Sequence, residues 1–305
     1  MTDLIILENE ALKVIIDPDA GGKIRSFLSK KSGQEYLFQD PRSEFDASKG
    51  YSYHDITGYD ECFPTVGPCK YPGDPWDGRE VDDHGNLWQG PWKVERDGDL
   101  VEMSREVPEY ECLFERTLTL EDGGSLRFDY RIKNKGVYPV KYVYSAHPLF
   151  LGTPRTELIL PEEMERVYVY SATNIPGFEE GDWTDWPPPE ESGLNQLLAA
   201  ERNSCAKLFS PPLMEGKAGI RHGGTGERLE IDFDAETLPF LGILYVQGYD
   251  TLGDGVFKDS LFTAIEPTTG VGDEFPTCEA NGTLLELEPR RDTKFWIRFS
   301  IIPEE

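Results

Sequence analysis

The chain has 305 residues, of which 38% are hydrophobic and 12% aromatic, so it is long enough to bury a substantial core. Its formal net charge of -27 argues against nucleic acid and anionic membrane surfaces as partners, because both require clustered lysines and arginines. The N-terminus has no basic segment followed by an apolar one, and no apolar run is long enough to cross a bilayer, so neither a signal peptide nor a membrane span is predicted.

The cysteines indicate a reducing compartment. They are odd in number and scattered, which favours free thiols in a cytoplasmic protein over a disulfide framework. None belongs to a CxxC pair, so we predict no structural zinc site and no metal. The five are Cys62, Cys69, Cys112, Cys205 and Cys278.

Short strands in series dominate the chain. Alternating apolar residues separated by turn signals such as Gly123-Gly124 predict an all-β, mainly antiparallel fold, a large β-sandwich in a single domain over residues 1–305. Only residues 193–202 have a helical pattern. The expected strands are 4–7, 12–16, 23–28, 100–105, 110–120, 125–133, 140–146, 157–160, 166–170, 206–209, 228–233, 240–247, 261–266, 282–287 and 294–301.

Two long stretches lack a strand pattern, residues 38–92 and 171–212. Irregular segments of this length are commonly functional or linkers. We expect the first to form one wall of a site, because it is aromatic and polar. The second is expected to be a surface excursion, with a lid as the alternative.

Residues 82–92 concentrate groups suited to a small polar ligand. Gly85, Gly90 and Pro91 break regular structure, so the stretch is predicted to be a shaped loop. Tryptophan can cover the apolar face of a pyranose, while histidine and amide groups bind its hydroxyls. The alternative is that the tryptophans anchor the core. The loop carries Asp82, Asp83, His84, Asn86, Trp88, Gln89 and Trp92.

Two further groups stand at the ends of apolar strands. His147 and Glu266 each precede a proline that stops a strand, a placement suited to proton transfer in a cleft. The alternatives are a packed histidine and an edge glutamate that faces water. His54 and His222 are expected at the surface, and the alternative for His54 is a place in the aromatic wall.

Three short motifs, taken in order, resemble the aldose 1-epimerase (galactose mutarotase-like) family over nearly the whole chain. A fourth segment, residues 58–65, resembles a G-x-[DE]-E-x-F-P segment of bacterial members. The three motifs are Asp83-His84-Gly85-Asn86 with Pro91-Trp92, His147-Pro148-Leu149-Phe150, and Ile265-Glu266-Pro267.

The resemblance implies an isomerase that needs no cofactor, converts the anomers of a free aldose and has a sugar cleft on a large β-sandwich. It implies that Glu266 is the general base for the C1 hydroxyl and His147 the general acid for the ring oxygen. It also implies that His84 binds the sugar oxygens. We expect a small-molecule sugar as partner, and a monomer or homodimer.

The sequence departs from better-known members at the residues that bind the sugar. Asp60 and Glu61 stand where those members have an asparagine and an arginine, so we expect Asp60, Glu61 and Asp83 to decide which sugar fits. For the family's sugar-binding aspartate on a later strand, the candidates are Asp232, Gln247 and Asp250.

Three other functions stay open. One is a non-catalytic carbohydrate-binding protein, and another is a hexose-6-phosphate 1-epimerase, which would need an arginine cluster. The third is a glycoside hydrolase or lyase, for which Glu266 has no evident partner motif, although Asp60, Glu61 and Asp83 are present.

Overall fold

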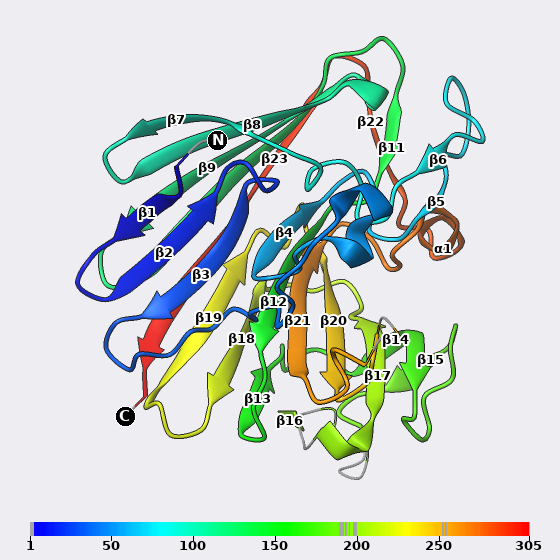
Figure 1. The fold of residues 1–305 in the computed structure, drawn as a ribbon. Helices are drawn as coiled ribbons and strands as arrows, with labels where there is room; N and C mark the ends of the chain where they lie inside the picture. Colours follow the sequence, from blue (N-terminus) through cyan, green and yellow to red (C-terminus); the bar gives the residue numbers. More distant parts are fainter. Residues whose placement is uncertain are drawn as a thin grey trace.

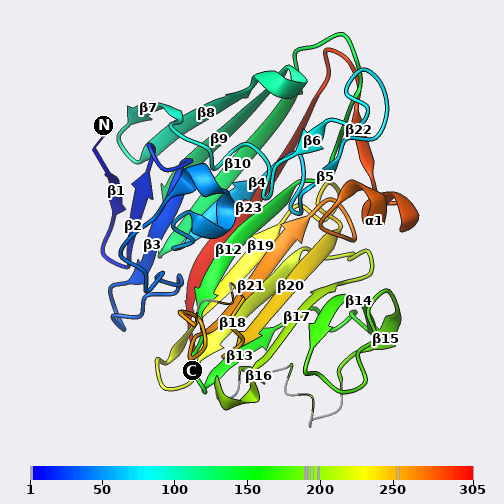
Figure 2. The ribbon, with the colours of Figure 1, turned by 45° about the vertical axis from the view of Figure 1, so that its right-hand side comes forward.

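Two antiparallel sheets pack face to face in the computed structural model of this protein (Figure 1, Figure 2). The structure describes residues 3–188, 192, 194, 196–197, 200–251, 253 and 255–304. In that part of the chain, every pair of neighbouring strands within a sheet is antiparallel, and the only α-helix is α1 (Phe275–Ala280). The large antiparallel β-sandwich predicted from the sequence is therefore confirmed.

The strands are described here in their spatial order. The ten-stranded sheet consists of β1 (Ile5–Glu8), β2 (Leu12–Asp17), β3 (Lys23–Ser29), β4 (Tyr59–Cys62), β12 (Ser145–Leu151), β21 (Leu261–Thr268), β20 (Phe240–Gln247), β17 (Ser204–Phe209), β14 (Arg166–Thr173) and β15 (Trp183–Asp185). The nine-stranded sheet consists of β16 (Gln196–Leu197), β13 (Thr156–Ile159), β18 (Lys217–His222), β19 (Glu227–Phe233), β23 (Asp292–Pro303), β10 (Ser125–Asn134), β9 (Cys112–Glu121), β8 (Leu100–Val107) and β7 (Lys93–Asp97). Two small ribbons pair β5 (Cys69–Lys70) with β6 (Glu80–Val81), and β11 (Val140–Tyr142) with β22 (Leu285–Leu287).

Burial along the strands shows where a second layer covers the sheet. In β2, β9 and β10, buried residues alternate with more exposed ones, as expected for strands with one face on a core. In β4, β12 and β21, nearly every residue is buried, so both faces are covered. One face meets the other sheet, and the other meets the loops that carry the candidate site.

Aromatic rings and one ion pair join the two sheets. Tyr59 of β4 packs against Phe128 and Phe299 of the nine-stranded sheet, with ring centroids 5.6 and 5.8 Å apart. Beside them, Arg116 of β9 donates to Glu61 of β4 at 2.9 Å, and both side chains are fully buried. This ion pair therefore crosses the interior of the sandwich.

Tyrosine hydroxyls satisfy the rest of the Glu61 carboxylate. Tyr130 and Tyr144 donate to its two oxygens at 2.9 and 2.7 Å. The Arg116 guanidinium also donates to the Gly22 carbonyl and lies over the Trp92 ring at 5.0 Å. Such partners help to make a buried ion pair tolerable, although the buried Arg116 Nε atom has none among the described residues.

The structure corrects several expectations about local structure. Residues 38–92 were expected to be irregular but contain β4, β5 and β6. His222 and His54 were expected at the surface, but both are buried: His222 ends β18 and shares a hydrogen bond with Thr156 at 2.8 Å. A histidine at a strand end beside glycines looks like a turn residue in the sequence, and only the pairing of β18 with β13 buries it.

Two other expectations, on a helix at 193–202 and on membrane spans, can be compared only with the described part of the chain. The helical window at 193–202 lies partly outside the described residues, and its described part contains β16 and the 3-10 turn η5 (Ala200–Arg202). None of the helices in the described part of the chain has both the length and the apolar character that crossing a bilayer requires.

We predict that Arg116→Met lowers the free energy of unfolding by about 3–5 kcal/mol, because Glu61 would remain buried without its cation. Denaturant unfolding of the purified variant measures this loss. Arg127→Met is the matched control, since Arg127 pairs with Asp129 on the surface and should cost at most about 1 kcal/mol. Equal losses in the two variants would contradict a special contribution from the buried pair.

Candidate active site

The pleat of the ten-stranded sheet gathers polar side chains on the face turned away from the other sheet. In the β4–β12 ladder, Asp60 lies opposite His147 and Cys62 lies opposite Ser145. Ser145 also lies opposite Thr268 of β21, two residues from Glu266. Because paired residues and those two positions away share a face, all of these side chains point to one side of the sheet.

Glu266 lies at the centre of this cluster and is fully buried. Lys207 of β17 donates to both of its carboxylate oxygens at 2.6 Å, and the Ser145 hydroxyl donates to one of them at 3.1 Å. The His147 Nε2 atom lies 3.9 Å from Glu266 Oε1. Donors from β12, which neighbours β21, and from β17, which lies beyond β20, thus fix the carboxylate in position, and it faces one imidazole.

Lys207 is held between two acids. Burial by itself lowers the pKa of Lys207, but the carboxylates of Asp273 and Glu266 outweigh burial, so the net shift is upward and the amine stays charged. Asp273 Oδ1 lies 3.5 Å from the Lys207 amine. Burial raises the pKa of Asp273 to about 6, against the opposing effect of Lys207.

His147 is neutral in this surrounding. Burial, followed by the charges of His84 and Lys207, lowers its pKa well below the ordinary 6.5. Its side chain is 6% exposed, and its Nδ1 atom is buried without a hydrogen-bond partner. Both properties suit a group that exchanges protons with a ligand rather than one that serves only the fold.

His84 completes the cluster from the loop that follows β6. Its Nδ1 atom lies 2.9 Å from Asp83 Oδ1, its ring stacks on Tyr51 with centroids 3.5 Å apart, and it meets the His147 ring edge-on at 4.8 Å. The backbone of His84 is left-handed, with φ of 58°, a conformation that costs a residue with a side chain and persists only where its surroundings hold it. The next residue, Gly85, has φ of 65°, and a Cβ there would lie 2.0 Å from the Phe63 carbonyl oxygen.

A pocket of about 210 Å³ opens onto His84 and His147. Its volume suits one small molecule, since drug-sized ligands usually occupy about 300–1,000 Å³. Tyr51 and Asp83 line both this pocket and an adjacent hollow of about 690 Å³ that reaches Trp88. The opposite wall of the smaller pocket is apolar and consists of Ile56, Leu149, Leu244 and Phe262.

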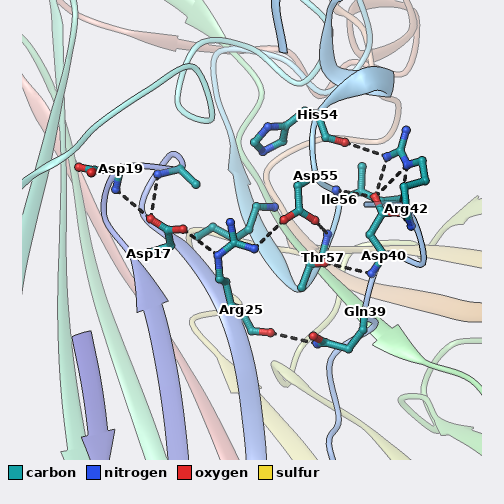
Figure 3. Close-up of polar contacts among 12 residues, drawn as sticks. Asp17, Asp19, Arg25, Gln39, Asp40, Arg42, His54, Asp55, Ile56 and Thr57 are labelled. Atoms are coloured by element: carbon teal, nitrogen blue, oxygen red, sulfur yellow. Dashed lines mark hydrogen bonds and ion pairs between the residues drawn. The ribbon is translucent and has the colours of Figure 1, made fainter. Parts of the chain in front are cut away.

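Hydrogen bonds and ion pairs of Arg25 and Arg42 fix the position of the segment that carries Tyr51, residues 38–58. Figure 3 shows Arg25 of β3 between Asp17 and Asp55, at 2.7 and 2.6 Å, and Arg42 bonded to the Asp40 carboxylate. Arg42 also donates to the main-chain oxygens of residues 52 and 54 at 2.8 Å each. These bonds hold the 3-10 turns η1 (Ala47–Lys49) and η2 (Tyr51–Tyr53) beside β4, where Figures 1 and 2 draw them in blue.

The structure brings together most of the residues singled out in the sequence. His84, His147 and Asp83 line the pocket, and Glu266 lies directly behind His147. Trp88 donates its indole N–H to the Asp83 carbonyl at 3.0 Å and lines the adjacent hollow, so it also anchors the loop.

Other singled-out residues lie beneath or away from the pocket. Asp60 is below it, bonded to the buried Lys23 and to the Tyr51 hydroxyl. Asn86 is buried in the loop and does not line the pocket, and its main-chain N–H bonds to the Phe63 carbonyl at 2.9 Å. Glu61 faces the core between the sheets, and the pleat turns Gln247 to the face opposite that of Glu266.

Sequence reasoning missed Lys207, Asp273 and Tyr51. Lys207 interrupts the otherwise apolar strand Cys205-Ala206-Lys207-Leu208-Phe209, which is the same signal that singled out Glu266. Tyr51 and Asp273 lie in irregular segments without such a signal. Asp232, once a candidate for the sugar, pairs with Arg298 on the nine-stranded sheet.

Comparison with known proteins identifies the fold of the chain. A family model described as a domain of unknown function (DUF5107) matches residues 1–82, and no curated protein sequence matches the chain. The Slr1438 protein from Synechocystis sp. PCC 6803 superimposes with a TM-score of 0.75 at 17% identity, covering 100% of this chain and 97% of its own.

Two solved bacterial structures carry the name of the fold. A galactose mutarotase-like protein from Clostridium acetobutylicum has a TM-score of 0.70 at 15% identity, covering 98% of this chain and 95% of its own. One from Lactobacillus casei has a TM-score of 0.69 at 16% identity, covering 98% and 100%. The chain therefore has the galactose mutarotase-like sandwich fold.

We predict that His147 remains neutral at pH 6.5, where an ordinary histidine is half protonated, because burial and nearby cations disfavour its charge. An NMR titration of the labelled imidazoles, assigned with His147→Asn, measures this. In urea-unfolded protein the same residue should titrate near 6.5. Since folding lowers this pKa, the unfolded chain binds the His147 proton more readily than the folded protein does. The free energy of unfolding should therefore decrease progressively as pH falls below about 6.5. A midpoint at or above 6.5 in the folded protein would contradict the buried, cation-flanked environment.

Proposed function

We propose that this protein is an aldose 1-epimerase that interconverts the α and β anomers of a neutral aldose by opening and closing the sugar ring. The observation that carries the proposal is the convergence of Glu266 and His147, 3.9 Å apart, with His84, at a pocket of about 210 Å³ that the two histidines line. These three residues come from β21, β12 and a distant loop, and packing of the sandwich alone does not require them to meet.

The proposed chemistry requires one base and one acid. Glu266 removes the proton of the C1 hydroxyl while His147, in its protonated form, donates a proton to the ring oxygen, and the bond between C1 and that oxygen breaks. The resulting aldehyde rotates about the C1–C2 bond. The ring closes on the other face as protonated Glu266 returns its proton to the carbonyl oxygen and His147 takes back the proton of the attacking hydroxyl. Acid and base are each worth about 10²–10⁴-fold.

Lys207 and Ser145 support this assignment because they fix the base. Two hydrogen bonds from Lys207 and one from Ser145 reach the Glu266 carboxylate, at 2.6 to 3.1 Å, and hold its oxygens near His147. Lys207 is thus a positioning residue rather than a proton donor to the sugar.

His84 serves as the sugar-binding residue of the pocket in this proposal. Its bond to Asp83 orients the ring, and the stack on Tyr51 holds its plane. The remaining nitrogen can then bond to the oxygen on which charge develops as the ring opens. The apolar wall opposite suits the C–H face of a pyranose or furanose.

Pairing of the cations favours a neutral sugar over a hexose 6-phosphate. Lys207 pairs with Glu266 and Asp273, Lys23 with Asp60, and Arg25 with Asp17 and Asp55. A phosphate would need a cluster of arginines free to bind it. Among the described residues lining the smaller pocket there is no arginine or lysine.

A non-catalytic carbohydrate-binding protein is the second candidate. It would use the same pocket and the same His84–Tyr51 wall. The buried Lys207–Glu266 pair favours the enzyme, because a binder gains nothing from a carboxylate held behind the pocket at the expense of its desolvation.

We predict that the protein accelerates the mutarotation of at least one fresh neutral α-aldose, and that Glu266→Gln and His147→Asn each lower kcat by about 10²–10⁴-fold. The reason is that each variant removes one of the two proton-transferring groups. Polarimetry or NMR exchange over a panel of pentoses and hexoses measures the rate, with a hexose 6-phosphate as the contrasting substrate.

Glu95→Gln, at an exposed position of β7, is the matched control and should keep the full rate. Circular dichroism checks that each variant is folded. If the protein accelerates mutarotation of no sugar in the panel but calorimetry still shows sugar binding, the enzyme proposal is wrong and the carbohydrate-binding protein is favoured. Full activity of either variant would overturn its assigned role.

The low pKa of His147 adds a pH prediction. As the acid, His147 must carry a proton, and in the free protein that form is a minority above its depressed pKa. We therefore expect kcat/KM to rise as pH is lowered from about 8, approaching tenfold per unit, after subtraction of the uncatalysed rate. A kcat/KM that increases with pH would reverse the roles and make His147 the base.

A further inference from the structure

One nucleophilic group at the site has no part in the proposed chemistry. Cys62 is fully buried at the end of β4, on the same face of the sheet as His147. One ligand atom from each of Cys62, His84 and His147 lies within 4.8 Å of the other two. A thiol and two imidazoles are the donor set that zinc and similar divalent transition metals prefer.

The two histidines are arranged to present free nitrogens. The Nδ1 atom of His84 is engaged by Asp83 at 2.9 Å, which leaves Nε2 as the ligand atom. A carboxylate bonded to the far nitrogen of a metal-binding histidine is a common support that fixes the ring and raises its basicity. His147, at least nine-tenths buried, has an Nδ1 atom without a hydrogen-bond partner.

Carboxylates outnumber lysines around the three ligands. The pairs Lys23–Asp60 and Lys207–Glu266 balance, which leaves the carboxylates of Asp83 and Asp273 in excess around the three ligands. Ligand atoms of a tetrahedral zinc ion lie about 3.5 Å apart, given bonds of about 2.0–2.3 Å. Side-chain rotations that move the ligand atoms by about 1 Å would therefore bring the three residues to metal-binding distance. The fourth coordination position would then open to the pocket.

We propose that Cys62, His84 and His147 bind one divalent transition-metal ion of the zinc type, and that this ion and the sugar exclude each other. Binding releases the thiol proton of Cys62 to solvent, since the thiolate is the ligand. The bound metal occupies the nitrogens of His84 and His147 that the reaction needs, so it inhibits. Metal binding stands independently, whereas the exclusion of sugar rests on the proposed function.

Cobalt(II) is the probe, because a thiolate–cobalt bond gives a charge-transfer absorption band that reports Cys62 directly. We expect the full chain to bind one cobalt ion with this band, and zinc to displace it. Cys62→Ser should abolish the band and weaken binding at least tenfold, and Asp83→Asn should weaken binding about 10–100-fold. Cys69→Ser is the matched control, because Cys69 is a partly buried cysteine outside the cluster. It should leave the absorption band and the cobalt affinity unchanged.

His84→Asn provides a second test should Cys62→Ser fail to fold, because the His84 side chain is 18% exposed and the substitution leaves the strands intact. It too should weaken cobalt binding at least tenfold. No thiolate band in the wild type, or a band that survives Cys62→Ser, would overturn the metal site.

The kinetic arm separates the two proposals. Zinc should inhibit mutarotation competitively with sugar, and Cys62→Ser should keep the basal rate while resisting inhibition. Cobalt binding without any mutarotase activity would sustain the metal site and reject the proposed enzyme. Activity that zinc inhibits equally in the wild type and in Cys62→Ser would reject the metal site and sustain the enzyme.

Discussion

The buried ion pair between Glu61 and Arg116 is the contact on which the arrangement of the site depends. It joins β4 of one sheet to β9 of the other, with two tyrosine hydroxyls completing the carboxylate. Because side chains alternate along a strand, fixing Glu61 toward the core fixes Asp60 and Cys62 toward the loops. A slip of one residue in β4 would exchange these environments, leaving Glu61 in the pocket and Asp60 in the core without Lys23. The ion pair therefore specifies register as well as holding the sheets together.

A second constraint is the charge balance within the site. The chain as a whole carries a formal net charge of -27, yet every buried acid in this region meets a cation or several donors. Lys207 is the pivotal group, since it contacts Glu266 and Asp273 and acts on His147 through space. Its charge fixes the carboxylate and, by the same field, disfavours a second positive charge on the imidazole. The lysine that positions Glu266 thus also disfavours the protonated form of His147.

The sequence predicted the fold class and most of the long strands, and it singled out the three residues His84, His147 and Glu266 that the structure brings together, because each gives a local signal. Alternating apolar residues mark half-buried strands, and a polar residue in an apolar run stands out, as Glu266 and His147 do. Both were expected at strand ends stopped by a proline, but β12 continues through Pro148 and β21 through Pro267. β4 was missed because it is buried on both faces and only four residues long, so it has no alternation to detect. For the same reason the opposite environments of Asp60 and Glu61 could not be told apart: two adjacent acids look alike until the register with β12 is known. The burial of His54 and His222 likewise depends on contacts with distant segments, which no local pattern encodes.

The features that suit the site to proton transfer also expose it to metal ions. A group that gives and takes protons must keep a nitrogen or oxygen free of permanent partners, and the unpartnered nitrogen of His147 is such a group. Asp83 orients His84 for a sugar oxygen and, by the same hydrogen bond, for a metal. With alanine or valine at position 62, two imidazoles alone would bind a divalent ion weakly, so the thiol is the feature on which the proposed metal site depends. Since Cys62 shares a strand with Glu61, the register that builds the pocket also delivers the thiol to it.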